Sequence, residues 1–323
     1  AQHGKLLIKA PEDTVADLQE LVDSLPNQPS AGTAIDLMAE MSAAEEAFST
    51  FSLHVSDASF RVAVAALARG ERPDPAAVRP EEFYNAFDYG DPAPTAGEPV
   101  ACAIEQCAHP LLPSRNLVRV GVRTAAAGRG AGQPLRLTVL LDNSGSMERE
   151  DRRAAVQAAM EQLATLLGPQ DVVTVVGFAR QPRLLCDRVS GDGVKAQLEG
   201  LVEKTPAEGG TNLEQALALA DELAMRQFAA GAQNRIVLLT DGAANLGNAD
   251  PEELAKRIEG LRQKGVSFDA AGFGTAGMND RMLERLTRDG NGRYYVVDGP
   301  EDADEQFAKK LAGAFRPAAE NVK

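Results

Sequence analysis

The stretch LRLTVLLDNSGSM, residues 135–147, decides the fold class. Its first half is an almost unbroken apolar run, which is typical of a β-strand covered by other elements on both faces. The run ends at Asp142, after which Ser144 and Ser146 alternate with other small residues. The question is what function one carboxylate and two hydroxyls would have directly after a buried strand.

The segments that follow alternate between helix and strand patterns. Apolar residues recur at Val156, Met160, Leu163 and Leu167, in steps of four, three and four, which predicts a helix. Further strands are predicted within 171–178, 182–187, 234–241, 266–274 and 292–298, and further helices within 194–204, 211–228, 250–265, 279–290 and 301–315. Such alternation predicts an α/β fold: a doubly wound, mostly parallel, Rossmann-like six-stranded sheet with helices on both faces. In these sheets ligands bind at the carboxyl ends of the strands, where the strand order reverses.

The part of the chain before this domain has a different pattern of apolar residues. Residues 51–55, 99–108 and 115–124 alternate as strands do, and two helical stretches lie within 61–70 and 74–87. These elements form a thin core, so we expect the region to pack on something larger. We expect the following division: an N-terminal extension over 1–45, a small α+β region over 46–124, a Gly-rich linker over 125–134, the α/β domain over 135–316 and a tail over 317–323.

Composition excludes several classes of function. The net charge is −14, with no stripe of Lys or Arg, which argues against a nucleic-acid surface and against an anionic membrane surface. No run approaches the ~18 apolar residues of a membrane span, so no transmembrane segment is predicted. Three cysteines do not make a disulfide framework, and Cys102 and Cys107 are expected as buried small apolar residues on opposite faces of one strand.

Three polar clusters fall where the binding crevice of the predicted sheet would lie. Asp142, Ser144 and Ser146 follow its first strand, Thr211 opens a helix after two glycines, and Asp241 ends another strand. All five are oxygen donors, as Mg²⁺ prefers, and the absence of Cys and His from the set disfavours Zn²⁺. Two carboxylates and three hydroxyls do not complete a dry coordination shell, so an outside ligand has room. Simpler roles remain open: Thr211 as a helix cap, and Asp241 with Gly242 as a turn.

The pattern Asp-x-Ser-x-Ser with a distant Thr and a distant Asp resembles the metal-ion-dependent adhesion site (MIDAS) of von Willebrand factor type A domains. The resemblance covers about residues 134–316, and all five positions match. It implies that Ser144, Ser146 and Thr211 offer hydroxyls to Mg²⁺, or to Mn²⁺ or Ca²⁺. It also implies that Asp142 and Asp241 hold the ion largely through water, and that an Asp or Glu carboxylate from a partner protein takes the open position.

Three segments before the domain, 50–60, 75–94 and 115–123, resemble the region that precedes the A domain in a bacterial group of von Willebrand factor type A lipoproteins, as does LTDGAANLG at 239–247. This resemblance implies a location outside the cytoplasm, periplasmic or at the cell surface, with a lipid tether in a longer precursor. Members of that group usually carry a further C-terminal region, so we expect a shortened chain or a shorter member.

The sequence therefore predicts a divalent-metal-dependent protein-binding module that is not an enzyme. Two alternatives stay open: an interaction module with an unused metal site, and a metal-dependent phosphoryl-transfer enzyme with Asp142 as nucleophile. The second is disfavoured, because that chemistry usually needs a second acid two residues on, where Ser144 stands. A Gly-rich GFGTAG at 272–277 matches a dinucleotide-binding pattern, but it follows a late strand and is interpreted as a tight turn.

Overall fold

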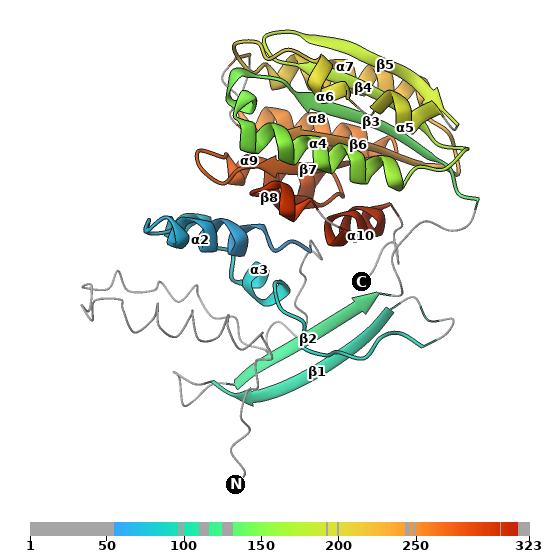
Figure 1. The fold of residues 1–323 in the computed structure, drawn as a ribbon. Coiled ribbons are helices and arrows are strands. Elements are labelled where there is room, and N and C mark those ends of the chain that lie inside the picture. Colours follow the sequence, from blue (N-terminus) through green and yellow to red (C-terminus); the bar gives the residue numbers. More distant parts are fainter. Residues whose placement is uncertain are drawn as a thin grey trace.

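A computed structural model describes residues 55–95, 98, 100–109, 116–124, 132–191, 193–198, 200–242, 246–247, 250–303 and 305–315. Its largest unit is a six-stranded sheet of order β5-β4-β3-β6-β7-β8 (Figure 1). The strands are β3 Leu135–Asp142, β4 Val172–Phe178, β5 Pro182–Ser190, β6 Gln233–Thr240, β7 Val266–Phe273 and β8 Tyr294–Val297. All neighbours are parallel except β4 and β5. The doubly wound, mostly parallel sheet is thereby confirmed, and its order reverses between β3 and β6.

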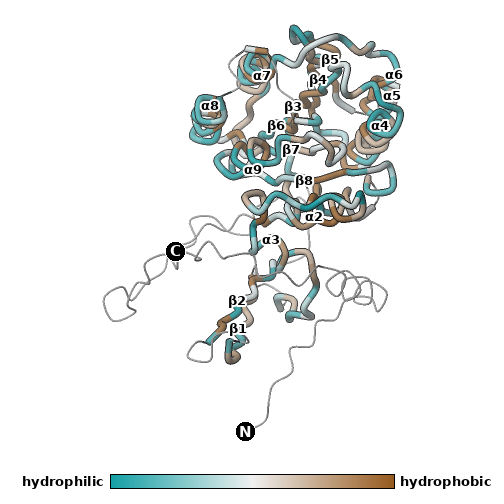
Figure 2. Tube along the Cα trace, turned by 90° about the vertical axis from the view of Figure 1, so that its left-hand side faces the viewer, coloured by the Kyte–Doolittle hydropathy of each residue, from teal (hydrophilic) through white to brown (hydrophobic). Residues whose placement is uncertain are grey.

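Helices cover both faces of this sheet. Figure 2 shows α7, α8 and α9 on one side of the strands and α4, α5 and α6 on the other. The helices of the domain are α4 Glu150–Thr165, α5 Gly193–Leu198, α6 Leu201–Lys204, α7 Leu213–Gln227, α8 Pro251–Gln263, α9 Asp280–Asp289 and α10 Glu305–Ala314. Side chains of β3 alternate between two cores: Val139 and Leu141 pack with α4, whereas Leu140 packs with α7. This two-sided burial explains why β3 is an almost unbroken apolar run.

Two stretches predicted as single helices are each broken in the structure. Residues 194–204 form α5 and α6, because Gly200 between them has φ +68°, a left-handed conformation that ends a helix. Residues 74–87 form a 3₁₀ turn, Pro75–Ala77, and then α3, Pro80–Asn85. Arg79 precedes Pro80 and is extended, as the proline ring requires of its preceding residue.

The N-terminal helix α2, Ala58–Ala68, lies against the edge strand β8 (Figures 1 and 2). Ala58 is fully buried in the core that α7, α8 and α9 share. Polar contacts join the N-terminal segment to the domain at several points: Lys310 Nζ to Asp57 Oδ2 at 2.9 Å, Arg61 to Asp302 at 3.4 Å, Arg69 to Thr275 at 2.8 Å and Arg79 to Asp280 at 2.6 Å. Helix α2 therefore packs against the β8 edge of the sheet, and Arg79, just before α3, is paired with α9.

Strands β1, Val100–Ala108, and β2, Asn116–Thr124, form a separate antiparallel hairpin, as their alternation predicts. Arg119 joins it to the preceding loop through both oxygens of Asp91, at 2.5 and 2.8 Å. Ile104 is 72% exposed. The expectation that Cys102 and Cys107 are buried is wrong, because the hairpin stands as a two-stranded sheet among the described residues and leaves both thiols in solvent.

Several expectations lie outside the described residues: the extension over 1–45, the strand residues Phe51 and Leu53, most of the linker and the tail. Within the part that is described, no helix has the length and apolar character needed to cross a membrane.

Thiol reactivity tests the exposure of the hairpin. We expect Cys102 and Cys107 to react with an aromatic disulfide reagent severalfold faster than Cys186, because Cys186 is half-buried and burial raises the pKa of its thiol. The measurement is the rate and amplitude of thiolate release from the native protein. A Cys186→Ser variant should keep the full fast amplitude of two thiols. A fast amplitude of one thiol would contradict the exposed hairpin.

Candidate metal centre

Asp142 ends β3 at the point where the strand order reverses. Its carboxylate is 2% exposed and is held from two directions. Oδ1 accepts the backbone N–H of Ser144 at 2.9 Å, and Oδ2 accepts the hydroxyl of Thr240, the last residue of β6, at 2.5 Å. Neighbouring strands therefore fix the orientation of this carboxylate before any ligand arrives.

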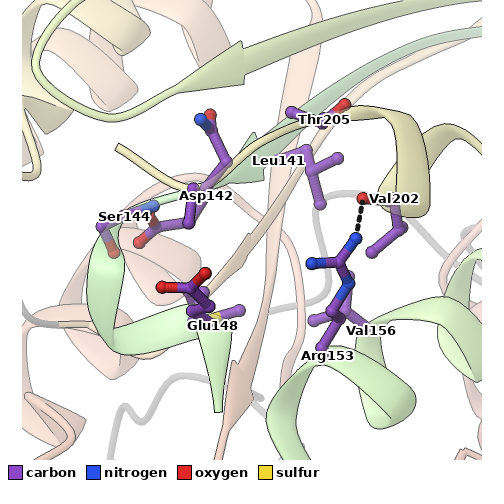
Figure 3. Close-up of a pocket in the computed structure, with 11 residues that line it drawn as sticks. Leu141, Asp142, Ser144, Glu148, Arg153, Val156, Val202 and Thr205 are labelled. Carbon is purple, nitrogen blue, oxygen red and sulfur yellow. Dashed lines mark hydrogen bonds between the residues drawn. The ribbon is translucent and has the colours of Figure 1, made fainter. Parts of the chain in front are cut away.

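The two predicted serines lie next to each other beyond Asp142. Ser144 Oγ and Ser146 Oγ are 3.1 Å apart, and Ser146 stands in a 3₁₀ turn, Gly145–Glu148, that leads into α4. Ser144 is buried and Ser146 is half-buried. Figure 3 shows the Asp142 carboxylate beside Ser144. The spacing of two thus places one carboxylate and two hydroxyls in a single cluster.

Asp241 follows β6 and is 1% exposed. Its negative charge repels that of Asp142 and so contributes to the raised pKa of the Asp142 carboxyl. Asp241 Oδ2 accepts a hydrogen bond from Arg152 Nη1 at 2.5 Å, in a buried ion pair. Gly242, the next residue, has φ +75°, so the turn expected at this position is present as well.

Thr211 is 2% exposed on the segment before α7, and its carbonyl accepts the N–H of Leu246 at 3.1 Å. The neighbouring Asn212 caps α7, because its side chain accepts the N–H of Gln215 at 3.1 Å. The capping role that the sequence left open for Thr211 therefore belongs to Asn212.

Two residues that the sequence analysis missed take part in this cluster, Thr240 and Arg152. Thr240 immediately precedes Asp241. It was missed because it lies at the end of an apolar run and looks like an ordinary strand residue. Arg152 stands four residues before Val156, on the face of α4 that carries Met160 and Leu163. A basic residue on the apolar face of a helix is a signal that sequence alone could have given.

Arg152 is 7% exposed and holds three parts of the structure together. Besides Asp241, its guanidinium donates to the carbonyls of Ser146 at 3.2 Å and Ala276 at 3.0 Å. Gly274 leaves room for it, since a Cβ there would lie 2.8 Å from Arg152 Nε. The loop after β7 is therefore part of the surroundings of the cluster.

Burial raises the pKa of Asp142 to about 6, and the charge of Asp241 adds to the rise, whereas hydrogen bonds from Thr240 and Ser144 oppose it. A buried carboxylate with a raised pKa lacks a sufficient positive neighbour. A cation bound beside Asp142 would provide that neighbour.

The donor set fits a small hard cation. Among the described residues no group of three or more His, Cys, Asp and Glu side chains could hold a metal ion, so a site here depends on hydroxyl donors beside its carboxylates. Asp142, Ser144 and Ser146 are already clustered, and the hydroxyl oxygens of the two serines face each other. Oxygen donors with few carboxylates suit Mg²⁺, which keeps several waters, better than Zn²⁺.

A pocket adjoins the cluster at the start of α4 (Figure 3). Asp142 and Ser144 form one side of it, and Glu148 and Arg153 stand at other points of its lining. Its apolar lining consists of Leu141, Met147, Val156, Val202 and Ala207. Asp142 and Ser144 thus line a hollow that has both apolar and charged walls.

The raised pKa of Asp142 gives the metal-free protein a defined pH dependence. The folded pKa of about 6 exceeds the unfolded value of 3.8, so the folded state binds more protons between these values. Stability from this group is present below the unfolded pKa and is lost as pH rises through about 6. At pH 8, Asp142→Asn should therefore raise the free energy of unfolding by up to about 3 kcal/mol, with little difference at pH 4. Denaturant unfolding in chelator measures it, and a gain that persists at pH 4 would contradict the assignment to Asp142.

Comparisons with known proteins agree with the α/β part of the fold. Residues 137–243 match the family model described as von Willebrand factor type A domain, and residues 33–119 match one described as von Willebrand factor. The first match begins within β3 and contains both Asp142 and Asp241. It supports a von Willebrand factor type A domain in this part of the chain, a family whose members are often metal-dependent interaction modules.

Among curated proteins, the chain is 30% identical over 287 residues to the uncharacterized protein YfbK of Escherichia coli K12, covering 87% of this chain and 50% of that protein. A von Willebrand factor type A structure from Catenulispora acidiphila is 21% identical with a TM-score of 0.49, covering 68% of this chain and 47% of that one. A structure of mussel byssus proximal thread matrix protein 1, described with a zinc-occupied MIDAS motif, is 20% identical with a TM-score of 0.46, covering 56% and 45%. The chain spans about half the length of the curated relatives it matches first.

Proposed function

We propose that this chain is a divalent-metal-dependent protein-binding module, and that a partner protein supplies an Asp or Glu carboxylate to the metal. The observation that carries the proposal is the oxygen cluster of Asp142, Ser144 and Ser146 at the switch point of the sheet. Ligand sites of open α/β sheets lie at this point. The family-model match over residues 137–243 supports the same class of function.

In the proposed site, Ser144, Ser146 and Thr211 would offer hydroxyls to Mg²⁺, Mn²⁺ or Ca²⁺, and Asp142 and Asp241 would provide the negative charge. The bound ion would supply a positive charge that attracts a carboxylate. Thr240 and the backbone of Ser144 hold Asp142 in place, so the ligand set loses little freedom when it binds. The adjoining pocket would contact the partner residues next to the carboxylate and so contribute to specificity.

The proposed module is not an enzyme and acts outside the cytoplasm, at the cell surface or in the periplasm. Neutral hydroxyls next to Asp142 suit the capture of a carboxylate, and no second acid stands two residues after Asp142 as phosphoryl transfer would need. The acidic net charge of −14 argues against nucleic acid as the partner. The extracytoplasmic location rests on the resemblance of the N-terminal segments to exported proteins.

A pair of measurements tests the proposal. Because a ligand that binds the folded state stabilises it by mass action, saturating Mg²⁺ or Mn²⁺ should raise the melting temperature of metal-stripped protein. A pull-down from extracts should then recover a partner that chelator releases and added Mg²⁺ restores. A melting temperature that is indifferent to both ions would refute the metal site. A partner retained equally in chelator would leave an interaction module that does not use the ion.

A further inference from the structure

We propose that Arg152 is a built-in counter-charge of the metal centre, which weakens metal binding and strengthens the binding of a carboxylate to the bound metal. This inference rests on the proposed function and specifies how the same site is tuned. Arg152 and Asp241 form a buried ion pair, with Nη1 and Oδ2 2.5 Å apart.

The position of Arg152 is costly to maintain, which calls for an explanation. The side chain is 7% exposed, and its Nε is a buried donor without a hydrogen-bond partner. It also stands in the first turn of α4, which begins at Glu150. The positive end of the helix dipole lies there, so a cation at this place is disfavoured. Burial of the charge, the unpaired Nε and the unfavourable end of the helix dipole all reduce stability. We therefore infer that Arg152 serves binding and not stability.

The guanidinium changes the charge that an incoming ion meets. Asp142 and Asp241 together with Arg152 leave the cluster with a net charge of −1, where two carboxylates alone would give −2. Glu148 and Arg153 in the adjoining pocket have opposite charges and do not alter this balance. A divalent ion therefore produces a centre of +1 with Arg152 present and a neutral centre without it. The positive centre attracts a carboxylate, and the less negative empty site attracts the metal less.

Arg152 acts through Asp241 and is thus a positioning residue rather than a ligand. Its two carbonyl contacts, to Ser146 and Ala276, hold the guanidinium beside Asp241. A bound ion and the guanidinium would then both interact with the carboxylate of Asp241. The shared carboxylate couples the two affinities in opposite directions.

The test compares Arg152→Gln with Arg152→Lys in the full chain. Glutamine keeps an amide donor for the carbonyls of Ser146 and Ala276 but removes the charge, whereas lysine keeps the charge. Isothermal titration of metal-stripped protein measures the Kd for Mn²⁺. Titration of the Mn²⁺-saturated protein with acetate at constant ionic strength, followed by water-proton relaxation, measures the affinity for a carboxylate.

For Arg152→Gln we expect the Kd for Mn²⁺ to fall about tenfold and the Kd for acetate to rise about tenfold. Arg152→Lys should leave both within about threefold of the wild type. Weaker Mn²⁺ binding in Arg152→Gln would overturn the inference, because it would mean that Arg152 merely holds Asp241 in place. Two affinities that change in the same direction would overturn it as well.

Failure of the proposed function has a separate signature. Wild-type protein that binds no Mn²⁺ refutes the metal site and the counter-charge together. Wild-type protein that binds Mn²⁺ but not acetate refutes carboxylate capture, and the Mn²⁺ affinity of Arg152→Gln then still decides whether Arg152 weakens metal binding. If Arg152→Gln unfolds in chelator, its Mn²⁺ affinity is read from the metal concentration that restores folding, and the same direction is required.

Discussion

Asp142→Asn removes divalent-metal binding, with an expected rise in the Kd for Mg²⁺ or Mn²⁺ of at least about 100-fold. The reason is charge and geometry together. Asp142 is one of two carboxylates in the proposed ligand set, and affinity in oxygen sites depends on the number of charged ligands. Its carboxylate is held in place by hydrogen bonds from Ser144 and Thr240.

Isothermal titration of metal-stripped protein measures this loss, and Glu222→Gln is the matched control. Glu222 is exposed on α7, and its substitution removes the same unit of charge far from the cluster. The control should bind metal as the wild type does. The asparagine variant should remain folded and, above pH 6, be more stable than the metal-free wild type. Unchanged metal affinity in Asp142→Asn would refute the proposed site.

Asp269→Ala destabilises the domain by about 3–5 kcal/mol, the second large effect expected from the structure. Asp269 on β7 is fully buried. Its carboxylate accepts hydrogen bonds from Nε and Nη2 of Arg235 on β6, at 2.7 and 2.8 Å. It also accepts the N–H of Arg293 at 2.8 Å. Removing the carboxylate leaves a guanidinium that is 4% exposed without its counter-charge.

Urea unfolding measures this cost, and two further variants separate its causes. Asp221→Ala breaks an ion pair with Lys264 that is partly open to solvent and should cost less than about 1 kcal/mol. The double variant Arg235→Leu with Asp269→Leu removes both charges and should recover most of the loss. A double variant as unstable as Asp269→Ala would show that packing or the Arg293 contact, and not the unpaired charge, determines the effect.

The strands and most of the helices of the α/β domain were predictable because their apolar patterns are local. The apolar run over 135–141 indicates a strand that is buried on both faces. The pattern of each later strand likewise indicates how that strand is buried. The break at Gly200 was not predictable, because an isolated glycine inside a helical pattern does not reveal its φ angle. The burial of Cys102 and Cys107 was wrong for another reason: alternation indicates a strand but not what covers it.

Within the candidate site, the clustering of Asp142, Ser144 and Ser146 was predictable from the sequence, whereas the long-range contacts around it were not. The spacing of Asp142, Ser144 and Ser146 points to one cluster because all three follow a single strand end. The ion pair between Arg152 and Asp241 joins α4 to the end of β6, across 89 positions of sequence. A contact of that kind depends on the folded arrangement of two elements and leaves no local trace beyond a basic residue on an apolar helix face.

The docking of α2 against β8 has a consequence for the order in which the chain folds. Asp57 and Lys310, which form an ion pair across this contact, are 253 positions apart. At about 5–20 residues per second, a ribosome needs on the order of 10–50 s to synthesise the intervening chain. Helix α2 therefore leaves the ribosome well before the residue that pairs with Asp57 has been made. The contact between Asp57 and Lys310 therefore cannot form until the 253 positions that separate them have been synthesised.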